Sequence, residues 1–97
     1  MEQNFKKLLA SLRPRDTREL VADHVRRVVL NPVDRTATLH VDKRYAFNTI
    51  VAHGHIEQVI RAVKKAFGEG FGTVVSLESL NAHSDREKAV PHAIHYR

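Results

Sequence analysis

The 97-residue sequence contains no cysteine, so neither a disulfide nor a thiolate metal site can stabilise it. This composition fits a reducing compartment. The sequence also lacks any apolar run close to the roughly 18 residues that a membrane-spanning helix needs. Residues 1–12 have neither the long apolar core nor the small-residue cleavage site of a secretory signal. We therefore expect a cytoplasmic protein with no membrane association.

Signals for catalysis are equally sparse. The stretch GEGFG at residues 68–72 is not followed by Lys-Ser or Lys-Thr, and we expect a helix before it and a strand after it, the reverse of a phosphate-binding loop. It is typical of a helix cap followed by a turn. No spacing pairs a serine with a histidine as nucleophile and base. A domain of this size leaves little room for a deep active site, so we expect no enzyme activity and no cofactor.

Seven histidines are present, and two close pairs are candidate metal ligands: His53 with His55, and His92 with His95. A usable site needs three or four convergent ligands. No cysteine joins either pair, and no pocket rich in Asp or Glu is evident from the sequence. The first pair precedes a predicted helix, where exposure to solvent is expected. The sequence therefore predicts no metal site.

Basic residues are in surplus. The chain has 16 Lys and Arg against 11 Asp and Glu, which gives a formal charge of +5 and a pI of about 10. Such a surplus favours polyanionic partners, because contacts with phosphates release condensed counterions. Hydrophobic residues make up 42% of the chain, which is enough for the core of one small domain.

Apolar residues recur at helical spacing in three segments. Residues 2–12 form an amphipathic pattern that Pro14 ends. A second helix opens at Asp16 and runs to about Asp23. The strongest pattern covers residues 55–67 and is followed by a glycine suited to capping. Its apolar stripe consists of Ile56, Val59, Ile60, Val63, Ala66 and Phe67.

Three segments carry the pattern of strands. Residues 25–30 are rich in β-branched side chains, and residues 36–42 alternate apolar with polar side chains, as in a half-buried strand. The turn composition of residues 31–35 predicts a hairpin between these two. Residues 73–79 predict a third strand. Residues 81–97 are polar, and we expect them to form a loosely ordered tail.

The order helix, helix, strand, strand, helix, strand predicts a single α+β domain over residues 1–80. The strands have one apolar face and the helices carry matching apolar stripes. The economical arrangement is a three-stranded sheet with the helices packed on one face. The long helix then forms a crossover between the second and third strands.

The stretch VDKRYAFNTI, which begins at Val41, joins the second strand to the long helix and combines basic with aromatic residues. We expect Phe47 and Ile50 to point inward, whereas the preceding basic residues and tyrosine are too polar for full burial. Tyr45 is suited to stacking on an unpaired base. The predicted nucleic-acid-binding surface comprises Arg26, Arg27, Lys43, Arg44, Tyr45, Arg61, Lys64 and Lys65. A solvated rim with a half-buried tyrosine is the alternative interpretation.

The stretch TATLHVDKRYAFNTIVAHGHIEQVIRAVKKAFG, followed by TVVSL, resembles the N-terminal domain of the bacterial replication initiator DnaA and the core of DciA-type helicase loaders. The shared features are an alternating strand, a basic and aromatic junction and a long amphipathic helix, and the resemblance covers about residues 1–80. It implies a KH-like fold that docks to a helicase, to single-stranded DNA or to a second copy. The chain departs from the DnaA domain in lacking tryptophan. It also lacks the GxxG loop of true KH domains, so RNA clamping by that loop is not implied.

These observations together predict a non-enzymatic nucleic-acid-binding or DNA-replication adaptor module, with single-stranded DNA as the favoured ligand. The resemblance implies a replicative helicase or another replication protein as partner. The alternative is a protein–protein interaction or homodimerisation domain that does not bind nucleic acid.

Overall fold

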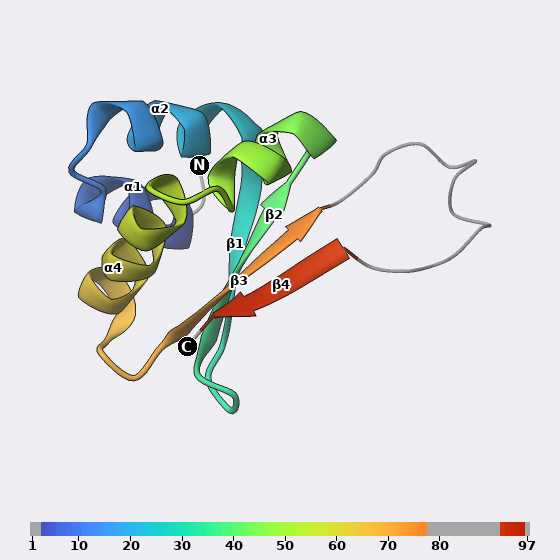
Figure 1. Cartoon of the computed structure of the whole chain (residues 1–97). Helices are drawn as coiled ribbons and strands as arrows, with labels where there is room; N and C mark the ends of the chain where they lie inside the picture. Colours follow the sequence, from blue (N-terminus) through green and yellow to red (C-terminus); the bar gives the residue numbers. More distant parts are fainter. Residues whose placement is uncertain (1–2, 78–91, 97) are drawn as a thin grey trace.

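The computed structural model describes residues 3–77 and 92–96 (Figure 1). These residues form an α+β fold with helices and a mixed sheet. The elements, in chain order, are α1 (Gln3–Ser11), α2 (Arg15–His24), β1 (Val25–Asn31), β2 (Thr36–Val41), α3 (Arg44–Ile50), α4 (His55–Phe67), β3 (Gly72–Leu77) and β4 (His92–Tyr96). Within these described residues, no helix is long and apolar enough to cross a membrane.

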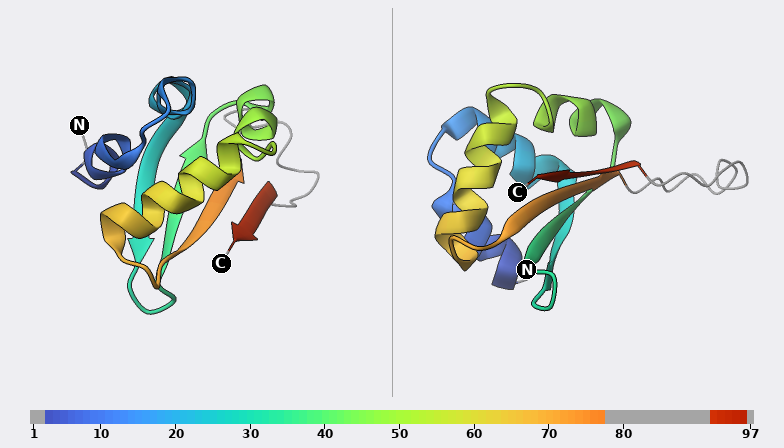
Figure 2. Two further views of the ribbon diagram at one scale, coloured as in Figure 1. Left: turned by 60° about the vertical axis from the view of Figure 1, so that its left-hand side comes forward. Right: turned by 60° about the horizontal axis from the view of Figure 1, so that its bottom comes forward.

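The sheet has the order β1-β2-β3-β4. The hairpin of β1 and β2 is antiparallel, β2 pairs with β3 in parallel, and β4 adds to β3 in the antiparallel direction. The parallel pair is joined by the crossover through α3 and α4. All the described helices lie on one side of the sheet, as the two views in Figure 2 show. The other face of the sheet is left open by these helices.

The core lies between the sheet and the helices. Val28, Leu39 and Val75 are neighbours in three adjacent strands, and all three are completely buried. From the helical side, Val59 and Val63 of α4 are completely buried as well. Full burial of such a side chain contributes roughly 1.5–3 kcal/mol relative to exposure. The predicted helix over residues 55–67 and its inward apolar stripe are confirmed.

Glycine sets both ends of α4. Gly54 precedes the helix with φ of 103°, and its N–H donates to the Glu57 carboxylate at 2.6 Å. Gly68 follows the helix with φ of 131°, and its N–H donates to the Lys64 carbonyl at 3.0 Å. Side-chain-bearing residues rarely adopt such positive φ values. The predicted capping role of Gly68 is therefore confirmed.

The prediction of a three-stranded sheet is wrong, because β4 supplies a fourth strand. The sequence analysis assigned its residues, His92–Tyr96, to a loosely ordered tail. In the structure, Ile94 lies opposite Val75, and Tyr96 lies opposite Thr73 and packs against the core. This short uncharged segment becomes a strand because the open edge of β3 offers a hydrogen-bonding partner. Residues 78–91 and 97 lie outside the described residues; they include the rest of the predicted tail and the last two residues of the predicted third strand.

The burial of the Thr73 hydroxyl group leads to a prediction about the stability of the fold. Thr73 is completely buried, and its Oγ1 has no hydrogen-bond partner among the described residues. A buried polar group without a partner costs about 1–3 kcal/mol. Substitution Thr73→Val keeps the shape and removes the hydroxyl, so urea unfolding should show a gain of about 1 kcal/mol.

Thr17→Val is the matched control. Thr17 is 2% exposed, but its hydroxyl is 2.8 Å from Nδ1 of His55. Removing this bonded hydroxyl should lower the free energy of unfolding by about 1 kcal/mol. If Thr73→Val were no more stable than the wild type, the hydroxyl would have a partner in solution.

Tyr96 tests whether β4 is docked. Burial raises the pKa of its phenol above the ordinary value of 10.0. The folded state thus favours the neutral phenol over the ionised one. The stabilisation that this preference gives to the fold is complete below pH 10 and is lost as the pH rises through the pKa of the folded state. The variant Tyr45→Phe leaves Tyr96 as the sole tyrosine, because the chain has 2. Its ultraviolet titration should have a higher midpoint in buffer than in denaturant; equal midpoints would show an undocked strand.

Candidate nucleic-acid interface

The joint between β2 and α4 contains a short helix, α3, that the sequence analysis did not predict. Ala46, Phe47 and Ile50 form its buried face, with exposures of 0%, 7% and 0%. Tyr45 points the other way and is 60% exposed. The expectation that Phe47 and Ile50 point inward is confirmed. The alternative of a half-buried tyrosine is not supported by its exposure.

Tyr45 belongs to a cluster with His24, Arg26 and Asp42, which we call the corner cluster. The rings of Tyr45 and His24 meet edge to face, with centroids 5.3 Å apart and planes at 77°. Nδ1 of His24 lies 3.2 Å from Oδ1 of Asp42, and Arg26 donates to Oδ2 of the same carboxylate at 3.0 Å. Asp42 is therefore the centre of the cluster, with a side chain only 6% exposed.

The local strand pairing explains how these residues meet. The N–H of Asp42 donates to the carbonyl of His24 at 3.0 Å, which extends the hairpin by one step past the pair Val25 and Val41. The register shifts between Val25 and Arg27, as in a β-bulge. A bulge re-aims side chains. It leaves both Arg26 and Arg27 exposed, although they are consecutive in the strand.

The corner cluster presents charge and an aromatic ring together. Asp42 is engaged with Arg26 and His24, whereas Lys43 and Arg44 are exposed at the start of α3. The phenol ring of Tyr45 lies directly after them in the chain. Cations of this kind contact phosphates, and an exposed ring provides a face on which a base can stack. The arrangement has the chemistry of a small single-strand contact.

The other predicted residues do not join this corner. Arg61 and Lys65 line a shallow hollow with Arg13, on the side of α4 that faces α1. Lys64 donates to the carbonyls of Glu69 and Phe71, at 3.3 and 3.4 Å, and so holds the loop after α4. In Figures 1 and 2, this end of α4 lies far from α3.

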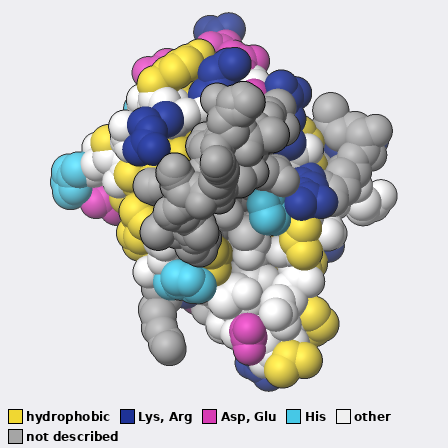
Figure 3. All heavy atoms as spheres, turned by 90° about the vertical axis from the view of Figure 1, so that its right-hand side faces the viewer, with side chains coloured by type: hydrophobic (Ala, Val, Ile, Leu, Met, Phe, Trp, Pro, Cys, Tyr) yellow, Lys and Arg dark blue, Asp and Glu magenta, His cyan; other side chains and the backbone are white. Residues whose placement is uncertain are grey.

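Arg27 lies elsewhere again, since it pairs with His40 across the hairpin. In Figure 3, the Lys and Arg side chains of one face appear in several groups. Of the predicted surface, the structure therefore brings together Arg26, Lys43, Arg44 and Tyr45. The other predicted residues, Arg27, Arg61, Lys64 and Lys65, lie outside this group.

Sequence reasoning missed His24 and Asp42 as parts of the site. They are 18 positions apart, and no local spacing signals their contact. The close pair His53 and His55 also separates: Nδ1 of His53 lies 2.9 Å from Glu57, and Nδ1 of His55 lies 2.8 Å from Thr17. In the described part of the chain, no three His, Asp or Glu residues are grouped as metal ligands would be.

Comparisons with known proteins find no matching family model, no matching curated protein and no matching solved structure. Function is therefore inferred from the residues themselves.

The central role of Asp42 can be tested by Asp42→Asn. The substitution removes the charge that holds His24 and Arg26, while it preserves the size of the side chain. The free energy of unfolding should fall by about 1 kcal/mol in urea titrations. Most of this loss should come from the partly buried His24 contact, because Arg26 is 63% exposed and such ion pairs contribute little.

Asp23→Asn is the control, since Asp23 is exposed and the change in net charge is identical. It should leave the unfolding curve nearly unchanged. Equal effects of the two substitutions would mean that net charge, and not the corner cluster, determines the response.

Proposed function

We propose that this protein is a non-enzymatic, cytoplasmic nucleic-acid-binding module with a KH-like topology. The observation that carries the proposal is the corner cluster together with the two exposed cations, Lys43 and Arg44, that precede its tyrosine. This tyrosine is 60% exposed, and its ring meets that of His24 edge to face. Single-stranded DNA is the favoured ligand, because stacking requires a base that is not already paired.

The order of the elements supports the KH-like assignment. Two helices, a hairpin, a crossover helix and a further strand follow one another from α1 to β3. The short α3 and the edge strand β4 are additions to that order. The resemblance to the DnaA N-terminal domain and to DciA-type helicase loaders extends the proposal to a replication adaptor, whose protein partner is a replicative helicase or another replication protein.

Binding by the corner cluster and the two neighbouring cations should be modest. Lys43 and Arg44 are adjacent and can neutralise only a few phosphates, and one tyrosine can stack on one base. The phosphate contacts and the stacking are both few compared with those of proteins that bind long single strands. We therefore expect micromolar or weaker affinity at physiological salt. Such affinity suits an adaptor that acts beside a larger replication protein.

A homodimerisation or protein-docking domain is the second candidate, and the edges of the sheet favour it. The edge strand β1 carries Arg26, Arg27 and a bulge, which protect an edge against pairing. The opposite edge, β4, has the sequence HAIHY without Lys, Arg, Asp or Glu, and its Ile94 is 38% exposed. An uncharged edge strand can pair with a strand of another chain.

Two substitutions separate charge from stacking at the corner. Lys43→Ala with Arg44→Ala should flatten the salt dependence of single-strand binding by up to about two phosphate contacts, or roughly 0.7 units of slope for each. Tyr45→Ala should weaken binding by about 1–3 kcal/mol and leave the slope unchanged, because stacking releases no counterions. Fluorescence anisotropy at several salt concentrations measures both effects.

Lys6→Ala with Lys7→Ala is the matched control, since it removes the same charge from exposed positions on α1. It should change the slope much less than the corner substitutions. Absence of wild-type binding to any nucleic acid at low salt, where attraction is strongest, would refute the proposal and favour protein docking.

A further inference from the structure

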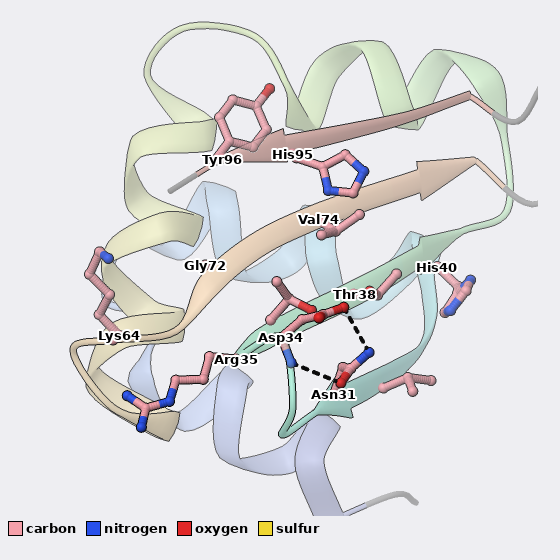
Figure 4. Close-up of a pocket in the computed structure, with 13 residues that line it drawn as sticks. Asn31, Asp34, Arg35, Thr38, His40, Lys64, Gly72, Val74, His95 and Tyr96 are labelled. Carbon is pink, nitrogen blue, oxygen red and sulfur yellow. Dashed lines mark hydrogen bonds between the residues drawn. The ribbon is translucent and has the colours of Figure 1, made fainter.

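The face of the sheet that the helices leave open contains a groove of about 800 Å³ (Figure 4). Its floor is a row of side chains in register across the four strands: Val29, Thr38, Val74 and His95. His40 lies beside this row, two residues further along β2. The floor thus combines two aliphatic side chains with imidazole and hydroxyl groups.

One end of the groove is positively charged. Arg35 and Lys64 line it there, and Figure 4 shows both at the end near the loop between α4 and β3. Asp34 is the carboxylate that also lines the groove, and its Oδ2 accepts a hydrogen bond from Asn31 at 3.1 Å. The two carbonyls that hold Lys64 are neutral and leave its charge in place. The two cations therefore exceed the one carboxylate.

The backbone of Arg35 is unusual. Asn31 organises the turn, since its Oδ1 accepts the N–H groups of Val33 and Asp34 at 3.0 and 3.1 Å. The turn then places Arg35 at φ of 57°, a left-handed conformation that favours Gly or Asn. Arginine at this position costs backbone strain, which is often retained where a side chain serves a function.

The side chain of Arg35 is positioned by the neighbouring loop. The N–H of Gly72 donates to the Arg35 carbonyl at 2.8 Å. A Cβ atom on Gly70 would lie only 3.3 Å from Nη1 of Arg35, so the guanidinium group lies closely over this glycine. Gly70 and Gly72 thus bring the loop between α4 and β3 against Arg35. This contact directs the charge of Arg35 to the rim of the groove.

We propose that this open face binds a segment of single-stranded nucleic acid. Arg35 and Lys64 contact a phosphate, and an adjoining base lies on Val29, Val74 and His95. The inference rests on the proposed nucleic-acid function and adds to it a second contact surface, separate from the corner cluster. The cations at one end match a phosphate. The mixed floor suits the flat, partly polar surface of a base, and it suits an apolar protein segment less well.

A single-stranded nucleic acid fits this surface better than a free nucleotide does. Small-molecule sites bury most of their ligand in a cleft. Here His95 is exposed and Val29 is 42% exposed, so the groove is a surface that a base can cover without being enclosed. The backbone phosphate beside that base would contact Arg35 and Lys64 and so hold the base in place.

Arg35→Asn tests the inference without endangering the fold, because Asn tolerates the left-handed conformation. Its thermal midpoint should equal or exceed that of the wild type. Its affinity for a labelled oligothymidylate of about ten nucleotides should fall at least about threefold, with a shallower salt slope. Arg15→Gln removes the same charge from a side chain that is 83% exposed on α2, and it should change the affinity less than about twofold.

Imidazole NMR signals provide a direct readout of the surface. His95→Gln assigns the His95 resonance, which should shift during the oligothymidylate titration of wild-type protein. Thymidine monophosphate and oligoglutamate are the comparison ligands. Equal affinity for the mononucleotide would refute binding of a nucleic-acid strand and indicate a nucleotide pocket. Equal affinity for oligoglutamate would refute recognition of a base.

The two proposals fail in distinguishable ways. Absence of all oligothymidylate binding by the wild type overturns both. If binding depends on Lys43 and Arg44 while Arg35→Asn binds like the wild type and the His95 signal does not move, the open-face inference alone is overturned.

Discussion

The parallel pairing of β2 with β3 constrains the rest of this structure. Parallel neighbours cannot be joined by a tight turn, so the chain must cross over the sheet between them. The crossover here consists of α3 and α4, and both bury their apolar sides on the same face of the sheet. Ala37, Leu39 and Val41 of β2 are completely buried beneath these helices. Because the described helices all use that one face, the opposite face is left to polar and small apolar side chains.

The same constraint creates the corner at the end of β2. The chain must leave the strand at Asp42 and turn at once into α3, so the first residues of the crossover lie at the edge of the core. Phe47 and Ile50 anchor this turn in the interior, and Tyr45 is therefore directed outward by the helical period. Asp42 fixes the geometry from the strand side through its contacts with His24 and Arg26. Exposure of the tyrosine is thus a consequence of how its neighbours are buried.

Periodicity explains which parts of the fold were predictable. The long stripe containing Val59 and Val63 identified α4, and strict alternation identified β2, because each pattern spans enough residues to distinguish the two periods. The helix α3 has only 7 residues, and its signal was hidden in a basic and aromatic stretch. The strand β4 depends on the open edge of β3, which no local pattern reports. The predicted basic residues lie in separate places for a similar reason. The number of cations is known from the composition, but which of them share a face is known only from the fold. Contacts such as that of His24 with Asp42 require the folded hairpin.

Strand β2 connects the two surfaces that we propose as contacts for nucleic acid. Asp42 follows this strand directly and belongs to the corner cluster, and His40, two residues earlier, lines the groove of the open face. The row of Val29, Thr38, Val74 and His95 crosses β2 at Thr38, four residues before Asp42, so about 13 Å of extended chain separates the proposed base contact from the corner. If both surfaces bind the same strand, the second contact would form within one complex, and the effective concentration of the tethered segment would add to the affinity. Two weak contacts on one small domain would then hold a strand more firmly than either alone, and both would release readily as salt rises, because each depends on a few cations.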